Sequence, residues 1–142
     1  MSPTQLKTYV RDATRDALVE RLSAYDTVVE VGVGHRVDVA AGLAAAGVSV
    51  TTTDIRPRAV PVEVDFILDD ITVPDLRIYE NCDALYALNF PPELHQPAFE
   101  VAKTVGCDFL FTTLGGDPPA IPVIRETVPG DTIFVPEEFA DS

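Results

Sequence analysis

The chain is poor in basic residues, and it has no long apolar run. Ten lysines and arginines stand against 23 aspartates and glutamates, which gives a formal net charge of −13. Because proteins hold nucleic-acid phosphates with Lys and Arg, this balance argues against direct nucleic-acid binding by a basic surface. No apolar stretch approaches the ~20 residues that a membrane-spanning helix needs, so we expect no membrane partner.

Cysteine is also scarce. Cys82 and Cys107 are the only cysteines, and they lack the spacing of metal ligands. Residues 1–9 do not show the charged-then-apolar pattern of a secretory signal. We therefore expect reduced thiols, a cytoplasmic location and no metal site.

The order of apolar segments predicts the fold class. Hydrophobic residues make up 46% of the chain, which is enough for the core of one domain. Strand-like and helix-like segments alternate, which predicts an α/β fold with a doubly wound, mostly parallel, Rossmann-like sheet of five to six strands. We divide the single domain, residues 1–142, into an N-terminal helix (1–25), a βα core (26–115) and a loop with an edge strand (116–142). The predicted strands are Thr27–Val31, Val48–Thr53, Val62–Leu68, Ala84–Leu88, Asp108–Thr113 and Thr132–Val135.

Local signals place the helix boundaries. Ser2 and Gln5 have the spacing of a capping box around a proline, which predicts a helix start. Prolines at Pro91 and Pro92 predict the start of another helix, which ends at Gly106. Two prolines within residues 55–61 argue against a full crossover helix there.

The stretch Val28–His35 indicates a ligand site, because an apolar strand, an acid and two alternating glycines follow one another there. Glycine lets the chain turn sharply and lets backbone approach a ligand. A helix that starts after such a turn offers free N–H groups and the positive end of its dipole, which is typical of nucleotide sites. The third glycine of the dinucleotide fingerprint G-x-G-x-x-G would fall on Val37, so that fingerprint fails.

Glu30, Gly32 and Gly34 match the opening motif of methyltransferases that use S-adenosylmethionine (SAM), in which an acid precedes alternating glycines. Over residues 26–115 the chain resembles the Rossmann-like methyltransferase superfamily. In detail it is similar to a small archaeal family of uncharacterised, methyltransferase-like proteins. The resemblance implies SAM as cofactor at the Glu30–Gly34 turn, although the third glycine of the pattern is replaced by Arg36.

Glu30 lies in an apolar strand, which costs free energy unless the carboxylate is paired or faces a polar cavity. SAM is cationic at its sulfonium and amino groups, so one interpretation places Glu30 near that charge. The alternative is a salt bridge to Arg36 or hydrogen bonds to amides of the glycine turn. Arg36 itself either folds over the cofactor, pairs with Glu30 or marks a site that has lost its ligand.

Other acids follow later strands. Asp54 lies twenty residues after Gly34, where a carboxylate would accept hydrogen bonds from a ribose hydroxyl pair. The alternative is a cap on the next turn. Asp69 and Asp70 resemble a later methyltransferase motif, in which an acid or its neighbour meets the adenine amino group. A cap before Thr72 is the alternative.

Asn89 begins a segment, Asn-Phe-Pro-Pro, that resembles the Asn-Pro-Pro-aromatic signature of amino-methylating enzymes, with the order changed. We predict Asn89 and Asp69 as catalytic residues near the transferred methyl group. The alternative is that the prolines only start the next helix. Of the two histidines, His35 lies beside the glycine turn, and His95 is expected to be exposed on a polar helix face.

Three functions remain open at this point. They are a SAM-dependent methyltransferase, a non-catalytic nucleotide- or partner-binding module, and an oxidoreductase that uses NAD(P). Methyltransferases of this superfamily add two C-terminal strands and a substrate-binding insertion, and this chain has room for neither in full. We therefore expect that a substrate lid is missing, or that a second copy or a partner subunit supplies it; the substrate is not identified.

The acid excess makes a prediction about salt. Only two lysines accompany the eight arginines, a pattern typical of a halophilic cytoplasmic protein, in which salt screens the self-repulsion of an acidic surface. Raising potassium chloride from about 0.1 M to about 1 M shortens the Debye length from about 10 Å to about 3 Å. We expect the free energy of unfolding by urea to rise over that range. An unchanged value would favour the alternative, an acidic face that binds a partner.

Overall fold

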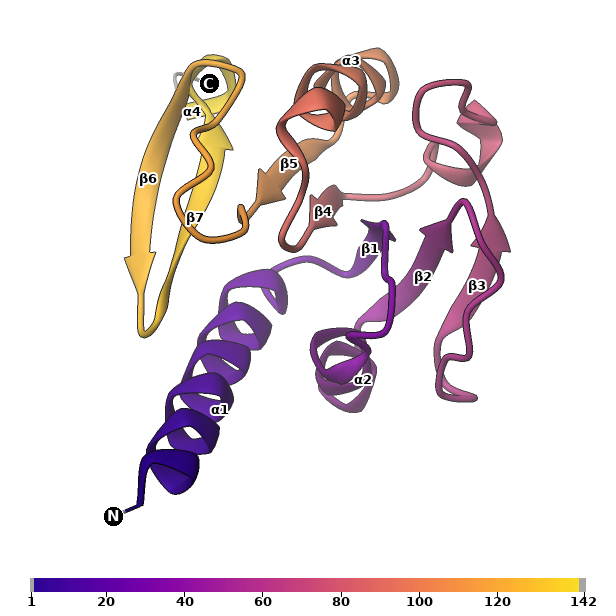
Figure 1. Cartoon of the computed structure of the whole chain (residues 1–142). Helices are drawn as coiled ribbons and strands as arrows, with labels where there is room; N and C mark the ends of the chain where they lie inside the picture. The colour runs from indigo at the N-terminus through magenta and orange to yellow at the C-terminus, as the bar shows by residue number, and fades with distance from the viewer. Residues whose placement is uncertain (1, 141–142) are drawn as a thin grey trace.

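The architecture is a seven-stranded sheet with helices on both faces (Figure 1). The computed structural model describes residues 2–140, and Met1, Asp141 and Ser142 lie outside the described part of the predicted domain. The strands are β1 (Thr27–Val31), β2 (Ser49–Asp54), β3 (Asp65–Leu68), β4 (Ala84–Ala87), β5 (Asp108–Phe111), β6 (Val123–Val128) and β7 (Asp131–Pro136). The helices are α1 (Pro3–Leu22), α2 (Asp38–Ala45), α3 (His95–Val105) and α4 (Glu137–Ala140), with 3₁₀ turns η1 (Leu76–Ile78) and η2 (Pro92–Leu94).

The strand order is β3-β2-β1-β4-β5-β7-β6. The pairs from β3 to β5 are parallel, and β7 is antiparallel to both β5 and β6. The order reverses between β1 and β4, so the carboxyl ends of these strands flank a switch point, where ligands of open α/β sheets bind.

The parallel strands β1, β2, β4 and β5 are mostly buried, because helices cover each side of the sheet (Figure 1), whereas β3 at the edge is largely exposed. Side chains of β1 alternate between the two cores: Val28 packs in the core under α1 and α2, whereas Val29 and Val31 pack in the core under α3. No helix within the described residues is both long and apolar enough to cross a membrane.

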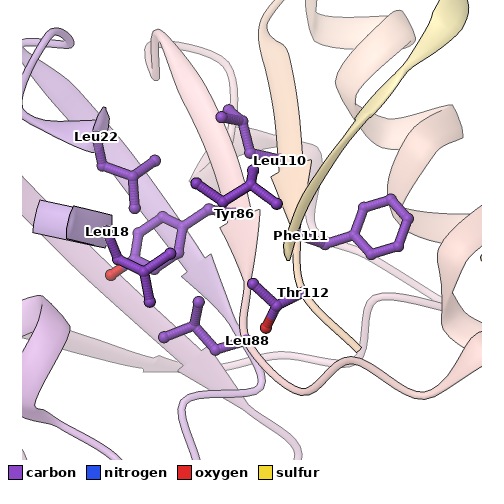
Figure 2. Close-up of a pocket in the computed structure, with 8 residues that line it drawn as sticks. Leu18, Leu22, Tyr86, Leu88, Leu110, Phe111 and Thr112 are labelled. Atoms are coloured by element: carbon purple, nitrogen blue, oxygen red, sulfur yellow. The ribbon is translucent and has the colours of Figure 1, made fainter. Parts of the chain in front are cut away.

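The contact between α1 and the sheet is a packing interface and not a ligand site. Leu18 and Leu22 of α1 lie over Tyr86 and Leu110, while Phe111 points to the opposite side of the sheet (Figure 2). The gap between these side chains has a volume of about 10 Å³. Such a gap is at the lower limit for one water molecule, so it leaves no room for a cofactor.

Several local predictions are confirmed. Ser2 and Gln5 form the reciprocal capping box at the start of α1. Gly106 ends α3 in the left-handed conformation, with φ 79°. The prolines before β3 leave residues 55–64 without a helix.

The C-terminal part of the sheet corrects the prediction. The sheet has seven strands rather than five to six, and the strand predicted at Thr132–Val135 is not an edge: β7 pairs with β5 on one side and with β6 on the other. The sequence did not indicate β6 because an edge strand with no buried face needs no apolar alternation; the neighbours Ile124 and Arg125 are both exposed. The chain therefore contains two C-terminal strands for which it was expected to lack room. The strand predicted from Val62 begins only at Asp65, because residues 62–64 form a turn.

His95 is a second correction, because it is fully buried rather than exposed. Its Nε2 lies 2.9 Å from the carbonyl oxygen of Phe90, and its Nδ1 accepts a hydrogen bond of 3.0 Å from the amide of Ala120. A carbonyl can only accept, so Nε2 carries the proton. The imidazole thus joins the segment after β4 to the loop after β5, an interaction that helical periodicity does not reveal.

The role of His95 predicts the effect of its replacement. Phenylalanine keeps the aromatic packing against Phe111 but leaves the Phe90 carbonyl and the Ala120 amide without partners. We expect His95→Phe to lower the free energy of unfolding by roughly 2 kcal/mol in urea denaturation. The control Gln96→Ala alters an exposed neighbour and should change it by less than about 0.5 kcal/mol. Equal effects would show that the buried hydrogen bonds contribute nothing.

Candidate functional site

The glycine turn after β1 is the centre of the candidate site. Gly32 and Gly34 have φ values of 70° and 57°, in the region that side-chain-bearing residues rarely adopt. The amides of Gly32 and Val33 both donate to the carbonyl oxygen of Thr53, at 2.9 and 3.0 Å. These bonds fix the turn to the end of β2.

Asp54 is the acid that connects the glycine turn to the turn after β2. Its carboxylate accepts hydrogen bonds from the amides of Gly34 (2.9 Å) and Arg56 (3.1 Å), and the Arg58 guanidinium lies 3.3 Å away. Burial alone would raise the pKa of Asp54, but the two amides and Arg58 outweigh it, so the pKa lies below its ordinary value. The predicted turn cap is therefore present. Oδ2 faces both the Gly34 amide and Arg58, whereas Oδ1 accepts only from the Arg56 amide and keeps one lone pair for a ligand.

A crevice of about 260 Å³ opens at the ends of β1, β2 and β3. We call it the strand-end crevice; its lining residues include Gly32, Asp54, Asp69, Asp70, Ile55 and Ile71. Sequence reasoning identified the four polar or glycine positions but missed the two isoleucines. The available signal was their place in the chain, because each isoleucine directly follows a candidate acid. Ile55 is 65% exposed, which is unusual for a large apolar side chain beside a buried acid.

The two adjacent aspartates have different partners. Asp69 accepts hydrogen bonds from the Tyr79 hydroxyl (2.6 Å) and the Asp75 amide (3.1 Å), so both of its oxygens are bonded to the segment before β4. Asp70 accepts from the hydroxyl and the amide of Thr72 with a single oxygen, Oδ1. The hydroxyl and then the amide of Thr72 lower the pKa of Asp70. Asp70 therefore keeps its charge, and its Oδ2 has no recorded partner among residues 2–140.

Glu30 does not line the strand-end crevice. Its side chain is buried on the opposite face of β1, and Oε1 accepts a hydrogen bond of 2.6 Å from the Tyr86 hydroxyl. Burial raises the pKa of Glu30 to about 8, against the lowering effects of Tyr86 and Arg36. At pH 7 the group is mostly protonated, so it is not a fixed negative charge in the ligand-free protein.

Arg36 and Asn89 lie together at a second crevice. The Nε of Arg36 pairs with Asp38 at 3.2 Å rather than with Glu30. Asn89 follows β4, and its side chain and that of Arg36 line a cavity of about 550 Å³ against α1 and the turn between β6 and β7. The predicted site residues thus fall into three groups: Gly32, Asp54, Asp69 and Asp70 line the strand-end crevice, Arg36 and Asn89 line the second crevice, and Glu30 and Gly34 line neither.

Comparison with protein families and curated sequences gives consistent matches. A model of an uncharacterised protein family, UPF0146, matches residues 14–138. A UPF0146 protein of Halobacterium salinarum is 50% identical over 115 residues, covering 80% of this chain and 89% of that protein. A UPF0146 protein of Archaeoglobus fulgidus is 44% identical over 90 residues, covering 63% of this chain and 69% of that protein.

Solved structures of similar fold include methyltransferases. An RNA methyltransferase from Salinibacter ruber, in complex with S-adenosyl-L-homocysteine (SAH), has a TM-score of 0.60 at 17% identity, covering 87% of this chain and 90% of that one. A TehB-like SAM-dependent methyltransferase from Corynebacterium glutamicum has a TM-score of 0.57 at 13% identity, covering 94% and 97%. A zinc-dependent alcohol dehydrogenase from Rhodobacter sphaeroides has a TM-score of 0.55 at 21% identity, covering 75% of this chain and 48% of that one. At these identities the likeness shows the fold and does not select the chemistry.

The raised pKa of Glu30 predicts a pH dependence of stability. In the folded protein Glu30 keeps its proton up to about pH 8, whereas the unfolded chain releases it near 4.5. The folded state therefore binds more protons between these values, and the free energy of unfolding falls as pH rises through them. We expect Glu30→Gln, which mimics the protonated acid, to remove this contribution, at most about 1.4 kcal/mol per pH unit.

The measurement is urea denaturation of both proteins from about pH 5 to about pH 9, taken as the difference between variant and wild type. Glu93→Gln makes the same chemical change at an exposed position and serves as the control. If the difference in free energy of unfolding between Glu30→Gln and wild type varies with pH as little as that for Glu93→Gln, the raised pKa of Glu30 is contradicted.

Proposed function

The chain belongs to the uncharacterised protein family UPF0146, and from the geometry of its strand-end crevice we propose that it binds SAM and acts as a methyltransferase. The observation that carries the proposal is the combination of two open carboxylate oxygens and two isoleucines around a glycine turn at the switch point of the sheet. The solved methyltransferases of the same fold support it, since one of them holds SAH.

The strand-end crevice suits the adenosyl part of SAM. Ile55, which is 65% exposed, offers apolar surface for one face of a purine ring; Ile71 also lines the crevice beside the aspartates, although most of its side chain is buried in the core. Its volume of about 260 Å³ is slightly below the ~300–1,000 Å³ usual for complete small-molecule sites. The crevice therefore fits one part of the cofactor, and the remainder would extend along the glycine turn.

Each acid has a separate task in this proposal. Asp54 would accept a hydrogen bond from a ribose hydroxyl with the lone pair that the Arg56 amide leaves open on Oδ1. Asp70 would accept one from the adenine amino group with Oδ2. Gly32, which has no side chain, leaves its backbone open to the ligand.

Methyl transfer needs few residues beyond those that position the reactants. SAM supplies an electrophilic methyl group on a sulfonium ion. Asn89 lies at the end of β4, beside the switch point, and would orient an acceptor there. A catalytic role of Asp69 stays a prediction. Both of its carboxylate oxygens already accept hydrogen bonds, one from the Tyr79 hydroxyl and one from the Asp75 amide.

The oxidoreductase hypothesis has less support in the residues. A dinucleotide needs close approach at the third glycine of its fingerprint, where this chain has Val37. A non-catalytic module that binds a nucleotide or a partner remains the alternative. It predicts either that the chain binds adenosyl compounds but has no methyl acceptor, or that it binds no adenosyl compound.

Calorimetric titration with SAH tests the proposal directly. We expect wild type in about 1 M potassium chloride to bind SAH and not NAD, because a screened surface keeps this acidic chain folded. Asp54→Asn keeps one oxygen for the Gly34 amide but removes the charge that accepts the ribose hydroxyl. The substitution should weaken SAH binding about tenfold, the usual effect of losing a charge-assisted hydrogen bond.

The matched control is Asp75→Asn, because Asp75 makes the same type of turn bond, to the Arg77 amide, outside the strand-end crevice. Its SAH affinity should equal that of wild type. Binding of NAD in place of SAH, or an unchanged affinity in Asp54→Asn, would overturn the assignment of the adenosyl site.

A further inference from the structure

The cavity that contains Asn89 is separate from the proposed adenosyl site and has a different chemical character. We call it the arginine crevice; it is lined by Val10, Arg11, Thr14, Arg36, Asn89, Gly130 and Asp131. Its volume of about 550 Å³ lies within the range of small-molecule sites. Arg36 and Asn89 follow β1 and β4, so the cavity lies at the carboxyl ends of the parallel strands, as the strand-end crevice does.

The cavity brings together two of the ten basic residues of a strongly acidic chain. Arg11, Arg36 and one aspartate, Asp131, are among its lining residues, in a protein with a net charge of −13. Arg11 has no carboxylate within 4.0 Å among the described residues. Arg36 pairs with Asp38 through Nε, which leaves its two terminal nitrogens for another acceptor.

Asp131, the carboxylate in the cavity, already serves the backbone. Its Oδ1 accepts a hydrogen bond of 2.8 Å from the amide of Thr132. It forms no ion pair with either arginine in the described part of the chain. Of the two arginines, Arg11 therefore has no carboxylate partner among the described residues, whereas Arg36 is already paired with Asp38.

The backbone of Asn89 is held in an unusual conformation. Its φ of 50° makes it the only residue other than glycine with a positive φ between residues 2 and 140. Asparagine tolerates this region better than most residues, but it still costs free energy. The Asn89 amide donates to Thr112 Oγ1 at 2.9 Å, and the next amide, of Phe90, donates to the Thr112 carbonyl at 2.8 Å. The backbone of Asn89 is thus fixed at the cavity wall, which sets the place from which its side chain can reach a ligand.

The opposite wall is built by close contact between α1 and the turn after β6. The Thr14 hydroxyl donates to the carbonyl oxygen of Pro129. A Cβ atom at Gly130 would lie 2.5 Å from Thr14 Oγ1 and 2.9 Å from Val10 Cγ1. Only glycine permits this approach, so this wall of the crevice is tightly packed.

We propose that the arginine crevice holds the methyl acceptor, and that the acceptor is a small molecule with an anionic group, a carboxylate or a phosphate, bound by Arg11 and Arg36. Guanidinium groups bind both anions with paired hydrogen bonds. The net charge of −13 favours a small anion over a polyanion, which the surrounding surface would repel. The acceptor role rests on the proposed function, whereas anion binding can be measured without it.

The test is a set of ¹H–¹⁵N NMR titrations of the whole chain with inorganic phosphate, with acetate and with SAH. Saturable shifts of the Asn89 and Gly130 amides by phosphate or by acetate are the expected result, and the probe that produces them identifies the anionic group. SAH should shift the Gly34 and Asp54 amides instead. These two sets of signals separate the anion site from the adenosyl site.

Substitutions assign the anion to its arginines. Arg11→Gln and Arg36→Gln should each weaken anion binding about tenfold and leave SAH binding in place. Arg77→Gln is the control, because Arg77 is highly exposed and pairs with Asp75 away from the cavity. Equal loss in the control, or no saturable shift with either anion while SAH binds, overturns the anionic-acceptor assignment alone.

Two further outcomes of these titrations would each overturn part of the proposal. Anion binding at these amides without any SAH binding overturns the proposed function and the acceptor role with it. Binding of a short single-stranded RNA in the absence of phosphate binding overturns the assignment to a small anion.

Discussion

The hydrogen bond from the Gly34 amide to the Asp54 carboxylate is the interaction on which the candidate site depends. It joins the turn after β1 to the end of β2, and the Gly32 and Val33 amides reinforce the junction through the Thr53 carbonyl. With the turn fixed, α2 starts at a defined place, and the strand ends that form both crevices keep their relative positions. Because Asp54 is buried, loss of its whole carboxylate group would leave the Gly34 amide without its acceptor as well as alter the crevice.

The sheet itself explains why the acids of the site behave differently. Glu30 and Asp54 lie on adjacent parallel strands, but the side chain of Glu30 enters the core under α1 and α2, where burial raises its pKa, whereas Asp54 lies at the strand end among amides that lower its own. Whether a carboxylate lies in the core or at the carboxyl end of a strand, more than its residue type, decides whether it is charged and available at neutral pH. The opening acid of the methyltransferase-like motif therefore acts here on the packing between β1 and β4 through Tyr86.

Much of the fold was predictable because local chemistry agrees with the tertiary structure. The capping box at Ser2, the left-handed stop at Gly106 and the buried strands β1, β2, β4 and β5 all carry signals within a few residues. The edge strand β6 carries none, since its side chains need not alternate when neither face is buried. His95 was mispredicted for a related reason: its hydrogen-bond partners, Phe90 and Ala120, come from separate loops that are not apparent from the helix on which it lies.

The sequence by itself determined the order of strands and helices from α1 to β5, the glycine turn and the strand-end acids, because each depends on residues that are neighbours in the chain. Only the tertiary structure decided which of those residues share a crevice and which are buried in the core. It placed Asp54 and Asp70 beside Ile55 and Ile71, buried Glu30 against Tyr86, and brought Arg36 and Asn89 to α1 and the turn at Gly130. The physical reason is that the face to which a side chain points, and the element packed against it, depend on pairing between strands more than thirty residues apart, such as β1 with β4.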